Sequence, residues 1–218
     1  MINIGINGFG RIGRLILRAI LENYRYKINV VAINVLGSIE TKAHLLKYDS
    51  THGIMKDEIT TLKDGFKVGE QNIKVFAERD PINIPWGKIG ADVVLECTGI
   101  FLDKSSAEKH IKAGAKKVII SAPGKEVDFT IVQGVNSKEL KKNHNIISNG
   151  SCTTNCLAPV AMVLEKSFGI SYGYMTTIHS YTGDQKLLDT LHKDLRRARS
   201  TEGAMIPTST GAAKAMSL

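Results

Sequence analysis

The sequence contains few cysteines and no long hydrophobic run. Its three cysteines are too few, and odd in number, for the disulfide framework of a small secreted protein. No stretch approaches the roughly 20 consecutive apolar residues that a helix needs to span a bilayer. The apolar residues 2–6 follow Met1 directly, without the basic flank and cleavable apolar region that define a signal peptide. These absences predict a cytoplasmic protein with no membrane partner.

The sequence is also poor in aromatic residues and proline. With 6% aromatic residues, it lacks the basic motifs interleaved with aromatics that RNA-binding folds use. Five prolines and twenty glycines, with 43% hydrophobic residues, exclude a disordered or low-complexity chain. The 29 Lys and Arg against 21 Asp and Glu give a net charge of +8, which would attract nucleic acid and a phosphorylated metabolite equally well. The composition therefore predicts a globular protein and leaves its ligand open.

Short apolar runs alternate with helical patterns over the first 150 residues. The patterns predict strands at residues 1–7, 28–34, 91–97 and 117–121, and helices at 11–23, 41–48 and 105–113. Ser105 is the expected N-cap of the last helix. Between residues 59 and 76 the apolar period is near two, and Asp64-Gly65 predicts a hairpin turn. Strands that alternate with helices predict an α/β fold with a doubly wound (Rossmann-type) parallel sheet.

The pattern changes near Gly150, where we expect a domain boundary. At roughly 150 residues per domain, the length predicts one domain plus part of another. A helix is expected over residues 153–168 and a strand over 172–179, followed by a long loop over 183–206. The sequence thus predicts a dinucleotide-binding domain over 1–150 and an incomplete α+β catalytic domain over 151–218. The Ala-rich residues 211–218 contain no stop signal, so we expect the chain to end within an element.

The turn after the first predicted strand carries Gly8, Gly10 and Gly13 in a G-x-G-x-x-G pattern. In that context the glycines allow a tight turn, approach of a pyrophosphate to the backbone and close helix packing, with the helix N-terminus facing the anion. An acidic residue about 20 positions further usually accepts hydrogen bonds from the adenosine ribose, but Val35 stands there. Since a carboxylate would favour NAD and repel the extra phosphate of NADP, the choice of cofactor stays open.

Cys152 lies at the start of a predicted helix, where unpaired N–H groups stabilise a thiolate. Cys97, inside an apolar strand, and Cys156, one turn into the helix, are interpreted as buried structural residues. His179 ends a predicted strand, where an imidazole can pair with a thiol. Its position in the sequence alone is equally consistent with a surface or satisfied core histidine. The other five histidines are interpreted as surface or satisfied core residues, and no metal site is predicted.

Longer motifs resemble the phosphorylating glyceraldehyde-3-phosphate dehydrogenase family. They follow the family's order along the whole chain: NGFGRIGR at 7–14, KYDSTHG at 47–53, ECTG at 96–99, VIISAP at 118–123, SNGSCTTNC at 148–156, TIHSYT at 177–182 and IPTSTGAAKA at 206–215. Gly150 stands where the family more usually has Ala. The resemblance implies that the chain corresponds to the N-terminal two thirds of a homotetrameric glycolytic enzyme.

The resemblance also implies a mechanism and a set of site residues. Cys152 would attack the aldehyde of glyceraldehyde 3-phosphate, His179 would take the proton, hydride would pass to the nicotinamide, and inorganic phosphate would cleave the thioester to 1,3-bisphosphoglycerate. The implied substrate- and phosphate-binding residues are Ser151, Thr153, Thr182, Arg197, Thr210 and Gly211. The implied cofactor-binding residues are Gly8, Gly10, Arg11, Ile12, Gly13, Asn34, Arg79, Thr98, Gly99, Ser121 and Gly183. Without the resemblance, the basic run 196–199 would be interpreted as a solvated face.

Several departures from the family pattern leave alternatives open. Val35 replaces the usual Asp, and Thr190-Leu191 replaces the Leu-Pro of NAD-specific bacterial members, which together predict dual use of NAD and NADP. Family members continue well beyond residue 218, so a product of this length is expected to be poorly soluble and inactive. The alternatives are an erythrose-4-phosphate dehydrogenase, which shares the Cys–His pair, and a truncated non-catalytic nucleotide- or RNA-binding chain. Nucleic acid is not the expected partner.

Overall fold

The computed structural model describes residues 1–210. Their strands are β1 (Ile2–Asn7), β2 (Ile28–Asn34), β3 (Tyr48–Asp49), β4 (Gly53–Ile54), β5 (Ile59–Leu62), β6 (Gly65–Val68), β7 (Gln71–Phe76), β8 (Val93–Glu96), β9 (Lys117–Ile120), β10 (Phe129–Thr130) and β11 (Ile146–Ser148). Their helices are α1 (Arg11–Asn23), α2 (Ile39–Lys47), α3 (Lys104–Lys112) and α4 (Cys152–Phe168), with 3₁₀ helices at Pro81–Asn83, Ser137–Glu139 and Leu195–Ala198. The chain divides into two compact units, and the second begins at Cys152.

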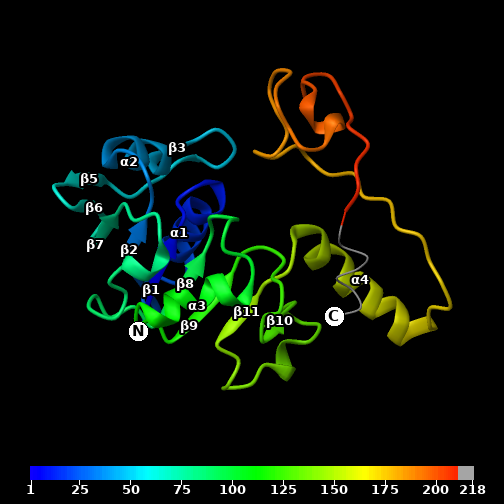
Figure 1. The fold of residues 1–218 in the computed structure, drawn as a ribbon, viewed down its shortest axis with the longest axis horizontal. Coiled ribbons are helices and arrows are strands. Elements are labelled where there is room, and N and C mark those ends of the chain that lie inside the picture. The colour runs from blue at the N-terminus through cyan, green and yellow to red at the C-terminus, as the bar shows by residue number, and fades with distance from the viewer. Residues whose placement is uncertain (211–218) are drawn as a thin grey trace. The chain divides into compact units, whose positions relative to one another are not determined.

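The first unit, Met1–Ser151, is built on one nine-stranded sheet (Figure 1). The strand order is β10-β11-β9-β8-β1-β2-β7-β6-β5, and all pairs from β10 to β7 are parallel. β1 thus lies between β2 and β8, so the chain winds outward from it in both directions. This is the strand order of the doubly wound fold, and it confirms the predicted fold class.

Apolar side chains on opposite faces of β1 determine how the sheet is covered. On one face, Ile4 and Ile6 join a buried cluster with Leu17 and Ile20 of α1, as the helical spacing of the apolar residues predicts. On the other face, the indole ring of Trp86 packs closely against Gly5. A Cβ added at Gly5 would lie only 2.3 Å from that ring, so the contact requires glycine. Side chains therefore fill both faces, as a parallel sheet requires.

Two local details of the first unit differ from the prediction. The N-cap of α3 is Asp103 and not Ser105: Asp103 Oδ1 accepts a hydrogen bond from the backbone N–H of Ser106 at 2.9 Å. Hydrogen bonds from Ser105 and Ser106 lower the pKa of Asp103 to about 2, so the capping group is a carboxylate. The predicted hairpin forms, but Leu62 pairs with Gly65, so the turn is one residue earlier than Asp64-Gly65.

The second unit is less regular than predicted. The helix expected over 153–168 is confirmed as α4, whereas the strand expected over 172–179 does not form. A strand needs a neighbour to pair its backbone N–H and C=O groups, and strand-like pairing within residues 152–210 is limited to a bridge between Lys186 and Ser200. The sequence pattern of residues 172–179 therefore did not suffice to form a strand. No helix formed by the described residues has the length and hydropathy needed to cross a bilayer.

Candidate active site

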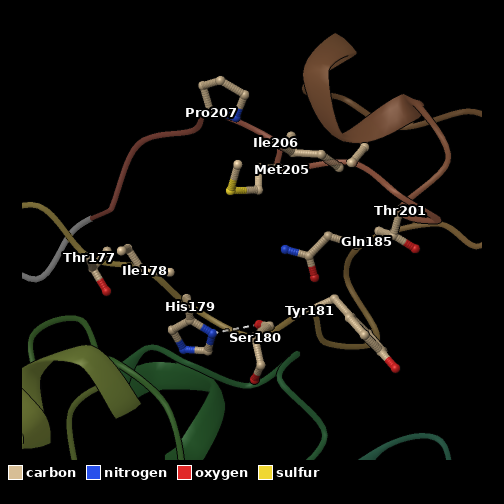
Figure 2. Close-up of a pocket in the computed structure, with 11 residues that line it drawn as sticks. Thr177, Ile178, His179, Ser180, Tyr181, Gln185, Thr201, Met205, Ile206 and Pro207 are labelled. Atoms are coloured by element: carbon tan, nitrogen blue, oxygen red, sulfur yellow. Dashed lines mark hydrogen bonds between the residues drawn. The ribbon is translucent and has the colours of Figure 1, made fainter.

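A thiol and an imidazole meet at the start of α4. Cys152 is the first residue of the helix, and its Sγ lies 3.0 Å from Nε2 of His179. His179 Nδ1 lies 2.7 Å from the backbone oxygen of Ser180, a contact that Figure 2 shows as a dashed line. Because a carbonyl oxygen only accepts, Nδ1 carries a proton and donates it to this bond. Nε2 of the neutral imidazole is therefore the atom that can take a proton from the thiol.

The two groups shift each other's pKa values in opposite directions. The hydrogen bond from His179, followed by those from the hydroxyl and N–H groups of Thr153, holds the pKa of Cys152 below its usual value. The hydrogen bond from His179 to Ser180, followed by the contact with Cys152, raises the pKa of the imidazole. Both shifts favour a thiolate beside an imidazolium, which is the reactive form of a cysteine nucleophile.

The other two cysteines have different surroundings. Burial raises the pKa of Cys97 to about 11, and its hydrogen bond to Ser121 offsets only part of that rise. Cys97 packs against the apolar cluster of the first unit, as its structural interpretation predicts. Cys156 was expected to be buried, and this is wrong: its side chain is exposed on α4. The error arises because α4 buries only Thr154 and Ala158, so a position one turn after the start of this helix is not necessarily buried.

His179 also lines a pocket of about 370 Å³ in the second unit (Figure 2). This volume lies in the range of pockets that bind small metabolites. The pocket includes Gln185, whose Oε1 accepts hydrogen bonds from the backbone N–H of Thr182 at 2.7 Å and from its hydroxyl at 2.9 Å. The motifs did not single out Gln185; its spacing of three residues from Thr182, typical of a side chain that closes a turn, was the available signal.

Arg197, a predicted phosphate-binding residue, joins two segments of the second unit. Its Nη1 lies 2.6 Å from Oδ2 of Asp184, and its Nε donates to the hydroxyl of Thr208 at 3.0 Å. Its Nη2 donates to the backbone oxygen of Ser209, which brings the guanidinium to the predicted phosphate-binding segment at Thr210. Of the remaining predicted residues, Thr153 contacts Cys152, Ser151 ends the first unit, and Gly211 lies outside the described residues.

The glycine turn after β1 has the geometry that a dinucleotide site needs. Gly8 has a φ of +93°, and a Cβ there would lie 2.7 Å from the backbone of Cys97 and Thr98. A Cβ at Gly13 would lie 2.2 Å from the backbone oxygen of Gly8, so α1 approaches the turn closely. Gly10, by contrast, faces open space within 4 Å. The first and third glycines permit packing, and the second leaves room beside the start of α1 for an anion.

Most of the other predicted cofactor residues also lie at this end of the sheet. Arg11 forms an ion pair with Asp49 at 2.7 Å, and Asn34 ends β2 beside Asn7 of β1. The remaining residues in the first unit are Ile12 on α1, Arg79 after β7, Thr98 and Gly99 after β8, and Ser121 after β9. Gly183 belongs to the second unit and is exposed.

Val35, at the position where a carboxylate was expected, packs against the apolar cluster of the first unit. The loop that follows carries a positive charge instead. A Cβ added at Gly37 would lie 3.7 Å from the amine of Lys42, whereas Glu40, on the first turn of α2, is the one carboxylate of residues 35–42. The end of β2 therefore presents an apolar residue and a nearby cation.

A doubly wound sheet with a glycine turn after its first strand defines the class of dinucleotide-binding α/β proteins. Two domain models of one family match the chain: the glyceraldehyde 3-phosphate dehydrogenase NAD binding domain over residues 2–104 and the C-terminal domain of that enzyme over residues 151–218. The chain belongs to the glyceraldehyde 3-phosphate dehydrogenase family.

Curated relatives extend along the whole chain. It is 55% identical over 217 residues to a glyceraldehyde-3-phosphate dehydrogenase of Xanthobacter flavus and 56% identical over 218 residues to one of Streptomyces coelicolor. A third, from Geobacillus stearothermophilus, is 56% identical over 218 residues. Each match covers 100% of this chain but only 65%, 65% and 64% of the respective relatives. The chain thus spans about two thirds of their length.

Proposed function

We propose that the protein to which this chain belongs is an oxidoreductase that converts glyceraldehyde 3-phosphate to 1,3-bisphosphoglycerate with a nicotinamide cofactor. The observation that carries the proposal is the 3.0 Å contact between Cys152 Sγ and His179 Nε2 in a chain whose first unit has a dinucleotide-binding turn. The family match supports the same reaction, since its relatives are named for it.

The thiol and the imidazole divide the chemistry between them. The Cys152 thiolate adds to the aldehyde carbon, and the imidazolium of His179 gives its Nε2 proton to the oxygen, forming a hemithioacetal. His179 then takes the hydroxyl proton back as the hydride leaves the carbon, and a thioester of Cys152 remains. The bound cofactor supplies the hydride acceptor. An oxygen of inorganic phosphate attacks the thioester carbon, the thiolate leaves, and the product is an acyl phosphate.

The side chains at the predicted phosphate-binding positions suit a phosphorylated substrate. Arg197 offers a planar guanidinium, and Thr182, Ser151, Thr153 and Thr210 offer hydroxyl groups of the kind that bind phosphate oxygens. We assign these residues, with Gly211, to the substrate phosphate and to inorganic phosphate. The ion pair with Asp184 leaves the guanidinium oriented before a phosphate arrives.

The decisive test is the phosphate dependence of NAD reduction by the full-length protein. With glyceraldehyde 3-phosphate, the rate should require inorganic phosphate, and Cys152→Ser should abolish it. Cys156→Ser serves as the matched control, because Cys156 is exposed on the same helix and should leave the rate unchanged. A higher kcat/KM for erythrose 4-phosphate would show the alternative substrate to be correct. Cofactor binding that survives Cys152→Ser, without any turnover of the wild type, would contradict the enzyme assignment.

The proposal includes dual use of NAD and NADP. It is supported by Val35 in place of a carboxylate and by the amine of Lys42 beside Gly37, because neither group repels a phosphate on the adenosine ribose. We expect kcat/KM values for the two cofactors within a hundredfold of each other, and Val35→Asp should lower the value for NADP selectively. A wild-type preference for NAD beyond a hundredfold would contradict dual use.

The remaining parts of the proposal concern assembly and location. We propose a homotetramer in the cytoplasm, as the family resemblance implies. Sedimentation of the full-length protein tests the stoichiometry.

A further inference from the structure

A row of buried polar side chains crosses the sheet at the last residues of three strands, immediately before loops that carry predicted cofactor-binding residues. Asn34 of β2, Asn7 of β1 and Glu96 of β8 are neighbours in register, and we call these three residues the buried row. They are 6%, 1% and 1% exposed. Because burial of polar groups is costly unless each one is hydrogen-bonded, a row of this kind needs complete pairing.

The hydrogen bonds of the buried row all run in one direction. Asn34 Nδ2 donates to Asn7 Oδ1 at 2.7 Å, and Asn7 Nδ2 donates to Glu96 Oε2 at 2.5 Å. The Asn34 amide also pairs with the backbone of Glu78, donating to its oxygen and accepting from its N–H. The side chain of Asn34, predicted to bind the cofactor, is thus already engaged and fixes the segment that carries Arg79.

Glu96 is the acceptor at which these hydrogen bonds end. Its Oε2 accepts from Asn7 and from His110 Nε2, which lies 3.0 Å away and is 0% exposed. The indole N–H of Trp86 donates to His110 Nδ1 at 3.0 Å, so the proton of the neutral imidazole must be on Nε2, facing Glu96. Glu96 Oε1 accepts hydrogen bonds from both the backbone N–H and the hydroxyl of Thr98. Four donors therefore converge on one carboxylate.

Each side of the buried row leads to a segment that is predicted to contact the cofactor. Asn7 immediately precedes the glycine turn at Gly8, and Asn34 holds the backbone next to Arg79. Thr98 begins the turn that contains Gly99, which has a φ of +72°. A change at Glu96 therefore reaches three loops that come from different parts of the sequence.

We propose that Glu96 is a positioning residue of the cofactor site, which fixes the loops after β1, β7 and β8 through Asn7, Asn34 and Thr98. This inference rests on the proposed use of a nicotinamide cofactor. Glu96 need not touch the cofactor, because its carboxylate acts through the backbone and amide groups that it holds. The charge is essential to this role, because both oxygen atoms of a carboxylate accept hydrogen bonds, whereas an amide of the same shape has one acceptor oxygen and one donor nitrogen.

The variant Glu96→Gln separates charge from shape. Whichever way the new amide turns, its NH2 group faces two donors: either Asn7 and His110, or the two donors of Thr98. At least one loop must then lose a hydrogen bond. In the full-length protein we expect the Kd of NADH, measured by its fluorescence, to rise about tenfold, which is typical of one lost buried hydrogen bond. The KM for NAD should rise similarly, and the KM for the aldehyde should stay within about twofold.

Val94→Ala is the matched control for a loss of stability alone. Val94 lies two residues before Glu96 on the same face of β8, is 0% exposed and belongs to an apolar cluster. Removing its methyl groups should lower the Tm and leave the Kd of NADH unchanged. If Val94→Ala raises the Kd as much as Glu96→Gln does, or if folded Glu96→Gln binds NADH as the wild type does, the proposal is overturned.

A milder variant covers the case in which Glu96→Gln does not fold. Thr98→Val removes one hydroxyl donor to Glu96 at a half-buried position and keeps the backbone donor. It should raise the Kd of NADH less than Glu96→Gln, in the same direction; an unchanged Kd would contradict the proposal. The binding assay needs no turnover, so a protein that binds NADH but lacks dehydrogenase activity would refute the proposed reaction and still test Glu96. Failure of the wild type to bind NADH would overturn both.

Discussion

At the scale of the single residue, Cys152 and Cys97 show how the surroundings of a thiol set its pKa. The pKa of Cys152 is lowered by a histidine and by the start of a helix, while that of Cys97 is raised to about 11 by burial. The position of Cys152 at a helix N-terminus was predictable from the sequence. The contact with His179 was expected only from the family resemblance, because the two residues lie 27 positions apart and the chain between them consists of α4 and an irregular segment.

The pH dependence of alkylation measures this difference. Because the thiolate is the reactive form, a lowered pKa keeps Cys152 reactive at pH values where an ordinary cysteine, with a pKa near 8.5, is protonated. We expect its reaction with iodoacetamide to have a midpoint below that value. His179→Asn should move the midpoint upward by about one pH unit or more. Reactivity that remains in Cys152→Ser gives the background from the other cysteines, and an unchanged midpoint in His179→Asn would contradict the pairing.

At the scale of the element, the predicted bounds are most accurate for helices and strands long enough to show a clear apolar period. The helix α1 and the strands β1 and β2 agree with the predicted residues to within one position. The strands β10 and β11, of two and three residues, are too short to show a period, and neither was predicted. The capping role of Asp103 was assigned to Ser105, because both residue types favour that position.

The glycines of the turn between β1 and α1 give a prediction at this scale. Gly13→Ala places a Cβ against the backbone oxygen of Gly8 and should destabilise the protein by about 1–3 kcal/mol, as overpacking does. Gly10→Ala meets no neighbour within 4 Å at a negative φ, so its Tm should stay close to that of the wild type. It should nevertheless weaken NADH binding, because it narrows the space left for the pyrophosphate. Thermal unfolding and NADH titration of both variants check this; equal Tm values would contradict the packing role of Gly13.

At the scale of the whole molecule, the two units differ in how they bury apolar side chains. The first unit contains three buried clusters, around Ile6, Trp86 and Val118. In the second unit, large apolar residues such as Phe168, Tyr174 and Ile178 are 84%, 99% and 95% exposed. Composition alone could not show which part of the chain exposes its large apolar residues.

This contrast predicts that residues 1–151 fold without the rest. We expect the fragment to unfold in one cooperative thermal transition and to bind little of the dye anilinonaphthalene sulfonate, because its apolar side chains are largely buried. Residues 1–218 should bind the dye strongly through the apolar side chains of the second unit. Strong dye binding by the shorter fragment, or a non-cooperative transition, would show that its clusters need the second unit.

The hydrogen bond between Trp86 and His110 makes hydrogen exchange at the Trp86 indole a measure of how often the first unit opens. Both side chains are 0% exposed, so their ring hydrogens meet solvent only when the surrounding sheet opens. Trp86 is the one tryptophan of the 218 residues, and its indole N–H therefore gives an isolated signal in this chain. In deuterated water the lifetime of that signal would report how often the sheet opens, without any substitution.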